Sequence, residues 1–416
     1  MKSGAMQSVS GLEWVMREFE VAIVGAGLAG SIAATMLARA GHSVAIVDPN
    51  ETYPDEFRCE KIDFDQIDIL NKAGIGSAVL AAATHDRTAW VSRLGHLVEK
   101  RPSDQLGIDY GRLVNTIRTE IPPEVTFIRG KVTAVANGPE TQKVTLASGE
   151  ILTARLVIMA SGLNNSLRQS LGMERCDFKP CYSITFGFDL EPAEGGSFPF
   201  RALTYYGEHP RSRVSYITLF PIGTRMRANF FVYRDLDDPW LREFRAAPEA
   251  MLKATMPRLE RLAGPFRVAG PVKVRPIDFY GTSNYRQPGV VLIGDAFGTA
   301  CPATGTGARK AMIDVERLCN GYVSTWLATP GMGVEKIADF YDDAAKVRSD
   351  RKSRALAASA KGMATDTGIY WWARRWASVA LGLARWARNI ARETWQSALQ
   401  SFHAAQAPAG SPKPRA

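Results

Sequence analysis

The feature that most constrains this 416-residue chain is a glycine-rich turn close to its start. Residues 20–24 form an apolar run rich in β-branched side chains, and residues 25–30 read Gly-Ala-Gly-Leu-Ala-Gly. Gly25 permits a tight turn, Gly27 lets the backbone approach a pyrophosphate, and Gly30 lets a strand and a helix pack closely. An apolar helix pattern then runs from residue 28 to residue 40. This order predicts a strand, a turn and a helix whose N-terminus binds phosphate.

A second short strand pattern, over residues 43–47, ends on Asp48. A carboxylate about 20 residues after such a turn can accept a hydrogen bond from a ribose 2′-hydroxyl. The same carboxylate repels a 2′-phosphate, which disfavours NADP and favours NAD or FAD. A glycine-rich turn that binds nothing is the alternative, and the strand, helix and carboxylate together disfavour it.

Composition places the chain among soluble globular proteins, with 46% hydrophobic and 22% charged residues. Its length predicts two domains and an appendage. No apolar stretch is long enough to span a membrane, and the first 16 residues lack the apolar core of a signal peptide. The five cysteines and five histidines show no spacing typical of metal ligands. We therefore expect a cytoplasmic protein with reduced thiols and no metal.

The middle of the first domain has short strand patterns over 125–128, 131–135, 143–146 and 150–154, which predict a small antiparallel meander. An apolar strand over 155–159 follows and leads into Ala160-Ser161-Gly162, as in a buried parallel strand.

Residues 179–274 change character, because aromatic strand patterns alternate with turns and a helix pattern covers 247–262. We expect an antiparallel sheet packed on the first domain. The next strand, 289–293, has the apolar continuity of the first strand and ends on Gly294-Asp295. A turn rich in glycine and proline then enters a helix from Ala308 to about Trp326, so the chain returns to its first domain.

The three separated motifs around Gly27, Ser161 and Asp295 together resemble the FAD-dependent aromatic monooxygenases of the p-hydroxybenzoate hydroxylase fold. Ubiquinone-type hydroxylases, flavin-dependent halogenases and geranylgeranyl reductases share this fold, and the resemblance covers about residues 18–330. It implies a Rossmann-like FAD-binding domain of the α/β class, discontinuous in sequence, with an inserted antiparallel-sheet substrate domain and a C-terminal helical tail. The implied domains are an N-terminal extension 1–17, an FAD-binding domain 18–178 and 275–330, a substrate domain 179–274, a helical region 331–400 and a disordered tail 401–416.

Carried over by position, the resemblance implies that the glycine turn holds the FAD pyrophosphate and Asp48 the adenosine ribose. Arg58 would lie near the pyrophosphate and flavin, and Asp295 would bind the ribityl chain. The turn before the helix at Ala308 would place a positive dipole end beside flavin N1, which is negative in reduced flavin. The expected cofactor-binding residues are Gly25, Ala26, Gly27, Leu28, Ala29, Gly30, Asp48, Arg58, Ser161, Gly162, Gly294, Asp295, Pro302, Gly305, Thr306 and Gly307.

Five other residues lie close to these motifs in the sequence. Glu60 and Lys61 fit an ordinary exposed pair. Cys301 either touches the flavin or fills space in the core. Arg309, in the first turn of a helix, opposes the helix dipole and suggests an anionic contact, as does the following Lys310.

The resemblance implies that reduced FAD reacts with O₂ at C4a and that the hydroperoxide transfers one oxygen to a small organic substrate. NAD(P)H is the candidate electron donor. Many hydroxylases of this family have Asp-Gly where this chain has Ser161-Gly162, which puts conventional NAD(P)H reduction in question. The tryptophan halogenase signature Trp-x-Trp-x-Ile-Pro is absent. No catalytic residue is assigned.

Two other functions remain open at this point. One is a flavin reductase or dehydrogenase of the geranylgeranyl reductase type, which inserts no oxygen. The other is an FAD-binding accessory factor that modifies a partner protein.

The basic character of the chain is concentrated near its C-terminus. The net charge is +9, and residues 331–416 contain 14 Lys and Arg against 7 Asp and Glu. Residues 370–399 predict one helix with an apolar stripe. The stripe consists of Trp372, Trp376, Val379, Leu383, Trp386 and Ile390. The stripe either docks on the protein's own body, or contacts a protein partner or a membrane surface, where the protein would be peripherally associated. We expect no nucleic-acid partner.

Overall fold

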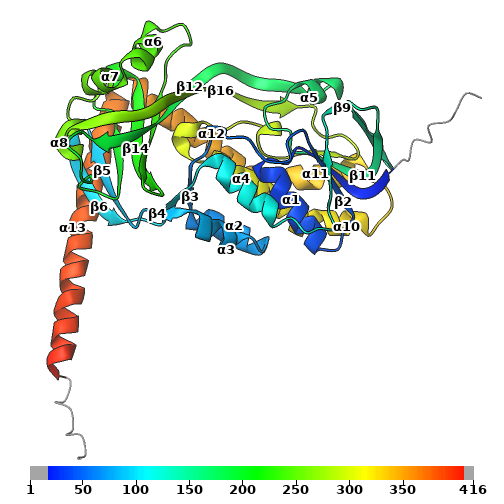
Figure 1. Ribbon diagram of the computed structural model, residues 1–416, viewed down its shortest axis with the longest axis horizontal. Helices are drawn as coiled ribbons and strands as arrows, with labels where there is room; N and C mark the ends of the chain where they lie inside the picture. The colour runs from blue at the N-terminus through cyan, green and yellow to red at the C-terminus, as the bar shows by residue number, and fades with distance from the viewer. Residues whose placement is uncertain (1–16, 407–416) are drawn as a thin grey trace, which may run out of the picture. The chain divides into compact units, whose positions relative to one another are not determined.

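The computed structural model describes residues 17–406, without the side chains of residues 393 and 397–406. The described chain divides into two compact units (Figure 1). Unit 1 contains residues 17–84, 106–183 and 275–357, and unit 2 contains residues 85–105, 184–274 and 358–406. The α/β fold class expected from the sequence is confirmed.

The sheet of unit 1 has a parallel centre and an antiparallel edge. Its strand order is β8-β2-β1-β11-β10-β9, and β17 pairs with β11. In the parallel centre, Val21 lies opposite both Val44 and Leu156, and Val157 lies opposite Val290. The strands are β1 (Arg17–Val24), β2 (Val44–Asp48), β8 (Thr126–Arg129), β9 (Val132–Ala136), β10 (Gln142–Leu146), β11 (Ile151–Met159) and β17 (Val290–Leu292).

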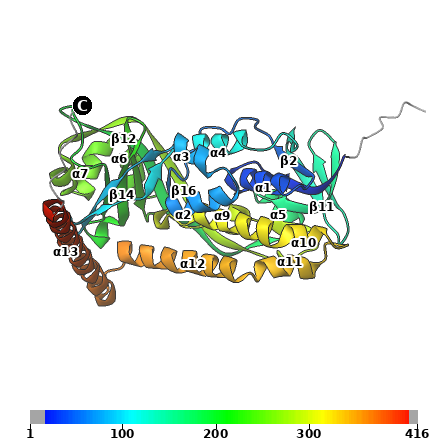
Figure 2. The ribbon, with the colours of Figure 1, turned by 90° about the horizontal axis from the view of Figure 1, so that it is seen from below.

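Successive side chains of a strand point to opposite faces, so the apolar centre of this sheet is buried on both sides. Val21 and Ile23 belong to one core cluster, and Ala22 and Val24 to another. On the face of the sheet that carries Val21 and Ile23, helix α1 packs against α4 and α9 (Figure 2). The helices of unit 1 are α1 (Leu28–Arg39), α2 (Phe64–Lys72), α3 (Gly76–Ala82), α4 (Tyr110–Thr119), α5 (Ser166–Ser170), α9 (Gly307–Leu318), α10 (Ser324–Leu327), α11 (Val334–Tyr341) and most of α12 (Ala344–Thr365).

Three sequence-based expectations for this unit differ in detail from the structure. Strand β8 pairs in parallel with β2 and is not part of the antiparallel meander, which consists of β9, β10 and β11. Residues 150–154 and 155–159 belong to the single strand β11, because no turn residue separates them. The helix expected over 308–326 is α9 followed by a π-helical turn (Cys319–Val323) and α10.

The sheet of unit 2 has the strand order β16-β12-β15-β14-β13-β5-β6. The pairs β12–β15, β15–β14, β14–β13 and β5–β6 are antiparallel, and β13 pairs with β5 in parallel. Strands β5 (Thr88–Arg93) and β6 (His96–Pro102) form a hairpin. The other strands are β12 (Glu174–Pro192), β13 (Ala202–Tyr206), β14 (Val214–Ile222), β15 (Arg225–Val232) and β16 (Phe266–Ser283).

Aromatic side chains fill the core of unit 2, where Phe244 of helix α6 (Pro239–Ala246) lies 4.5 Å from Phe186 between ring centroids. The helix expected over 247–262 is two helices, α7 (Pro248–Thr255) and α8 (Leu259–Ala263). Pro257 stands between them, and proline disfavours the helical conformation of the residue before it.

The C-terminal helix α13 (Ile369–Gln406) packs on the edge strand β6 and continues past it (Figure 1). Of the tail expected to be disordered, residues 401–406 are instead the end of this helix, because the first proline after them is Pro408. The rest of that tail, and the N-terminal extension before Arg17, lie outside the described residues. Among the described residues, no helix combines the length and the apolar content needed to cross a membrane.

Candidate functional site

The N-terminus of α1 is open to a ligand. Gly25 has a φ of +100°, and a Cβ on Gly30 would fall on the carbonyl oxygen of Gly25. These two glycines are therefore required by the turn itself. A Cβ on Gly27 would meet nothing nearer than the Tyr53 ring at 3.9 Å. In the described part of the chain no side chain caps this helix, so its first N–H groups can face an anion.

Asp48, at the end of β2, braces the glycine turn. Its Oδ2 accepts a hydrogen bond from the backbone N of Ala26 at 2.8 Å. Arg118 of α4 lies 3.4 Å from Oδ1 of Asp48 and donates from Nε to the carbonyl oxygen of Ala26 at 2.8 Å. Sequence patterns alone do not reveal this role of Arg118, because only the fold brings α4 beside the turn. The carboxylate thus stands beside the turn, where its hydrogen bonds orient the backbone.

Arg58 belongs to a charged cluster in the loop after β2. The carboxylate of Glu56 contacts Arg58 Nε at 2.8 Å, and it accepts from Tyr53 Oη at 2.6 Å and from Arg275 Nη1 at 2.7 Å. Burial alone would raise the pKa of Glu56, but the hydrogen bonds from Arg58 and Tyr53 hold that pKa at about 2. Glu56 therefore stays ionised and fixes two arginines. In the sequence, the position of Glu56 two residues before Arg58 is the only local signal for this pair.

The third motif meets this cluster through Asp295. Arg58 Nη1 lies 3.4 Å from Oδ2 of Asp295. The buried Arg168 of α5 donates to the carbonyl oxygen of Ala296 at 2.7 Å. Tyr280 Oη donates to the carbonyl oxygen of Asp295 at 3.1 Å. The backbone around Asp295 is thus held by β16 and α5, which leaves its carboxylate directed at the Arg58 loop.

The three motifs lie together at the carboxyl ends of parallel strands. A Cβ on Gly25 would lie 3.3 Å from Cα of Ser161, and a Cβ on Gly294 would lie 3.7 Å from Cβ of Ala29. The hydroxyl oxygen of Ser161 is buried with no hydrogen-bond partner among the described residues. At Gly162, whose φ is +59°, an added Cβ would meet nothing within 4 Å. Ligands of open α/β sheets bind at this edge.

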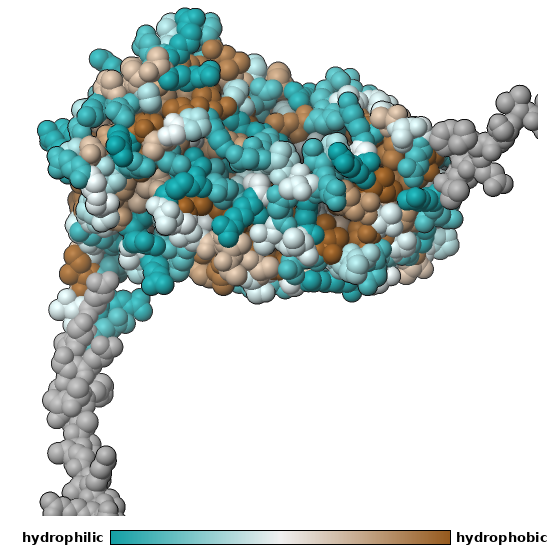
Figure 3. All heavy atoms as spheres, viewed as in Figure 1, coloured by the Kyte–Doolittle hydropathy of each residue, from teal (hydrophilic) through white to brown (hydrophobic). Residues whose placement is uncertain are grey.

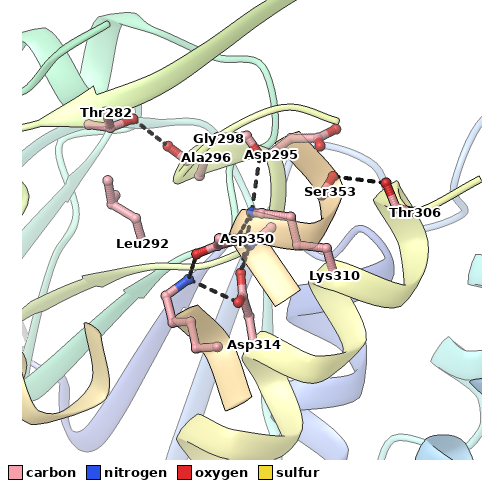
Figure 4. Close-up of polar contacts among 12 residues, drawn as sticks. Thr282, Leu292, Asp295, Ala296, Gly298, Thr306, Lys310, Asp314, Asp350 and Ser353 are labelled. Carbon is pink, nitrogen blue, oxygen red and sulfur yellow. Dashed lines mark hydrogen bonds and ion pairs between the residues drawn. The ribbon is translucent and has the colours of Figure 1, made fainter. Parts of the chain in front are cut away.

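The turn before α9 is fixed by hydroxyl contacts. Gly305 has a φ of +65° and ends the 3₁₀ turn Pro302–Thr304. Thr306 Oγ1 lies 2.8 Å from Ser353 Oγ of α12, and Gly307 begins α9 (Figure 4). No side chain in the described residues caps α9 and no acidic residue lies in its first turn, so its positive dipole end is open.

Four charged side chains lie behind this turn, two from α9 and two from α12, and all but the half-buried Asp350 are buried (Figure 4). Lys346 Nζ lies 2.9 Å from Oδ1 of Asp314, and Lys310 Nζ lies 3.3 Å from Oδ1 of Asp350. Asp314 Oδ2 also accepts from the backbone N of Gly294 at 3.0 Å. Lys310 donates to the carbonyl oxygen of Gly298 at 3.2 Å. Burial alone would lower the pKa of Lys310, but Asp314 and Asp350 raise it.

Other expectations near the site meet different outcomes. Glu60 is buried rather than exposed, because the loop carries it into the unit 1 core. Arg309 pairs with Asp65 at 2.6 Å, so its anionic contact is a protein carboxylate. Cys301 is buried with its Sγ 3.6 Å from Ser183 Oγ. The site also contains four side chains that the sequence motifs do not point to. These are Tyr53 and Glu56 beside Arg58, Arg118 beside Asp48, and Arg168 beside Ala296.

The residues present fit FAD. The space at Gly27 and at the α1 N-terminus suits a pyrophosphate, and the unpartnered Ser161 hydroxyl offers a hydrogen bond. The α9 N-terminus offers a positive dipole end to a flavin ring that becomes negative on reduction. Fold and site together define a flavin-dependent oxidoreductase of the α/β class.

Comparison with known proteins identifies the family. Residues 18–350 match the FAD binding domain family, and the chain belongs to it. The chain is 25% identical to 3-demethoxyubiquinol 3-hydroxylase of Escherichia coli over 340 residues, which cover 75% of this chain and 83% of that protein. It is also 25% identical to squalene monooxygenase of Mus musculus over 82% of its own length, and this match spans 59% of that enzyme.

The fold is shared with solved structures. The p-nitrophenol 4-monooxygenase of Pseudomonas putida superposes with a TM-score of 0.70 over 89% of this chain and 95% of that one, at 17% identity. The class expected from the sequence, an FAD-dependent monooxygenase, is confirmed.

Proposed function

We propose that this chain hydroxylates or epoxidises a small, largely apolar organic substrate with electrons from NAD(P)H. One atom of O₂ would enter the substrate and the other would leave as water, while NAD(P)H supplies two electrons and is oxidised to NAD(P)⁺. The named relatives act on a demethoxyubiquinol and on squalene, which supports an apolar substrate. The convergence of the α1 N-terminus, the Arg58–Asp295 pair and the α9 N-terminus carries the proposal.

The roles of the individual residues are part of this proposal. The turn Gly25, Ala26, Gly27, Leu28, Ala29, Gly30 would bind the pyrophosphate through backbone N–H groups, with Asp48 and Arg118 holding it in shape. Arg58 would face the phosphates from its contact with Glu56. Ser161, Gly162, Gly294 and Asp295 would line the ribityl chain, and Pro302, Gly305, Thr306 and Gly307 would lie beside the ring.

When bound, FAD supplies the redox chemistry and the activation of O₂. The protein would hold the flavin and the substrate in position and would exclude water from them. The dipole of α9 stabilises negative charge at its N-terminus, and the Lys310 network holds that terminus and the Gly294–Gly298 loop in one arrangement. The surface partner and peripheral membrane association expected from the C-terminal helix are a separate proposal, developed in the next subsection.

The test is an isotope experiment. FAD-loaded protein would be incubated with NADH or NADPH, ¹⁸O₂ and a panel of apolar phenols, quinols and alkenes, and the products would be analysed by mass spectrometry. One ¹⁸O atom in a product, and none when the label is in the water instead, is the expected result. A product that is reduced or desaturated without gaining oxygen would contradict the proposal.

A further inference from the structure

Helix α13 carries a row of large apolar side chains that the fold leaves exposed. Trp372, Trp376, Leu383 and Ile390 are 58, 49, 46 and 50% exposed. Their spacing places them on one side of an α-helix, and the rings of the two tryptophans lie 6.3 Å apart. We call these four residues the apolar row. On the face of the protein shown in Figure 3, hydrophobic residues are interspersed with hydrophilic ones, as on most proteins.

A different side of α13 docks on unit 2. A Cβ on Gly382 would lie 3.0 Å from Cγ2 of Val98 in β6, so the helix backbone approaches the strand closely there. Arg385 Nη2 lies 3.1 Å from Oε2 of Glu99 in the same strand. Arg375 is buried and donates to the carbonyl oxygen of Met363 at 2.8 Å. Docking therefore uses another side of the helix, between the apolar row and the exposed arginines, and leaves the four side chains of the row exposed.

Exposed arginines lie across the helix from the apolar row. With 3.6 residues per turn, Arg374, Arg388 and Arg392 are about half a turn away from Trp372 and Ile390. All three are exposed. The whole of α13 contains five arginines and one acidic residue. The helix therefore presents the apolar row on one side, the exposed arginines together with Leu381 and Trp395 on the opposite side, and its docked surface along a third.

We propose that α13 lies in the surface of an anionic lipid bilayer, with the apolar row at the boundary between headgroups and acyl chains. A helix with tryptophan and leucine on one side and arginine on the other is suited to this location. Tryptophan rings are stable where one edge is apolar and the other is wet. A second copy of the chain is the weaker occupant, because it would bring ten arginines together with only two acidic side chains on the paired helices. The proposal does not depend on the reaction proposed above.

Flotation of the full-length, FAD-loaded protein with vesicles tests the proposal. We expect flotation with vesicles that mix phosphatidylglycerol and phosphatidylcholine, and much less with pure phosphatidylcholine. Salt at about 0.5 M should weaken the binding, because the arginine contribution is screened. The variant W372S/W376S/L383S/I390S should partition into the anionic vesicles at least about a hundredfold less, since each of these side chains gains from burial.

A matched control uses exposed apolar residues of α13 that lie off the row. The variant L381S/W395S removes two side chains that are 60 and 65% exposed and should float like the unmodified protein. Equal flavin absorbance and circular dichroism would show that both variants are folded. Should the row variant fail to fold, quenching of tryptophan fluorescence by brominated lipid in the unmodified protein still decides the question. Unmodified protein that neither floats nor is quenched, or a row variant that floats equally well, would overturn the proposal. A dimer that forms through the row without binding lipid would overturn it too.

Discussion

The glycines of the turn at residues 25–30 have different physical roles. Gly25 and Gly30 are required by the polypeptide itself, because a side chain at either position would collide with backbone. The fold does not require a glycine at position 27, because the backbone conformation there suits any residue and the space beside Gly27 is open. A glycine that the fold does not need is best explained by a ligand that approaches the backbone there.

This difference predicts opposite behaviour for two alanine variants. Gly27→Ala should fold with nearly unchanged stability and bind FAD roughly tenfold or more weakly, because the new methyl occupies the path of the pyrophosphate. Gly30→Ala should lose about 2 kcal/mol or more of the free energy of unfolding, because the turn must shift. Chemical denaturation of the apoproteins and fluorescence titration with FAD separate the two effects. Equal loss of stability in both variants would contradict the conclusion that the fold requires Gly30 and that a ligand requires Gly27.

Glu56 makes stability depend on pH. Its pKa falls from an ordinary value of 4.5 to about 2 in the folded protein, because the hydrogen bonds from Arg58 and Tyr53 outweigh burial. A carboxylate with a depressed pKa contributes stability above its unfolded pKa and loses it as the pH falls through the folded value. The contribution of Glu56 should therefore be complete above about pH 4.5 and lost progressively toward pH 2.

Glu56→Gln removes this titration. The variant should be less stable than the unmodified protein near neutral pH, and the difference should shrink as the pH falls below about 4.5. Urea unfolding between about pH 6 and pH 3 would measure it. Asp342→Asn, which removes an exposed partner of Arg286, is a control with a smaller expected effect. If the difference in the free energy of unfolding between Glu56→Gln and the unmodified protein stayed constant over this pH range, Glu56 would not have the lowered pKa that its contacts with Arg58 and Tyr53 imply.

At the scale of elements, the sequence predicted best where local patterns decide the structure. The parallel strands and helices α1 and α9 follow from apolar periodicity and glycine turns. The pairing of strands that lie far apart in the sequence was harder to predict. Strand β8 joins β2 in parallel, and the β5–β6 hairpin adds to the sheet of unit 2, because only the assembled core determines these partners. Helix α12 was not delimited, since its side chains show weak amphipathic patterning.

The buried charges of α9 and α12 were likewise outside the reach of sequence. The sequence shows Lys310 as an unfavourable charge in a first helical turn, but its partners Asp314 and Asp350 come from two helices, and both also pair with Lys346. The four charges balance one another in a region from which water is largely excluded. Such a network holds only when every member is present.

Removal of one member should therefore destabilise the protein strongly. Lys310→Met leaves Asp350 and Asp314 short of one partner and should cost about 3 to 5 kcal/mol in the free energy of unfolding. Arg309→Met removes the neighbouring, more exposed cation and should cost less than about 1 kcal/mol. Denaturant unfolding compares them. If the two variants were equally stable, the network would have no role in holding the α9 terminus.

At the scale of the whole molecule, the account requires that FAD stabilises the folded chain. A ligand that binds only the folded state adds about 2.7 kcal/mol to the free energy of unfolding when its free concentration is a hundred times Kd. The unmodified protein should show this gain on titration with FAD, and Gly27→Ala should show much less at the same FAD concentration. Thermal unfolding at several FAD concentrations would measure it. Stability independent of FAD would contradict binding at the proposed site.

The most direct test of the central claim is anaerobic mixing of the FAD-loaded protein with NADH and with NADPH, followed by addition of O₂. We predict that a nicotinamide bleaches the visible absorbance of the bound flavin and that O₂ restores it, with Ser161 no obstacle to reduction. Bound flavin that neither nicotinamide reduces, with or without the panel of apolar substrates, would contradict an NAD(P)H-dependent monooxygenase.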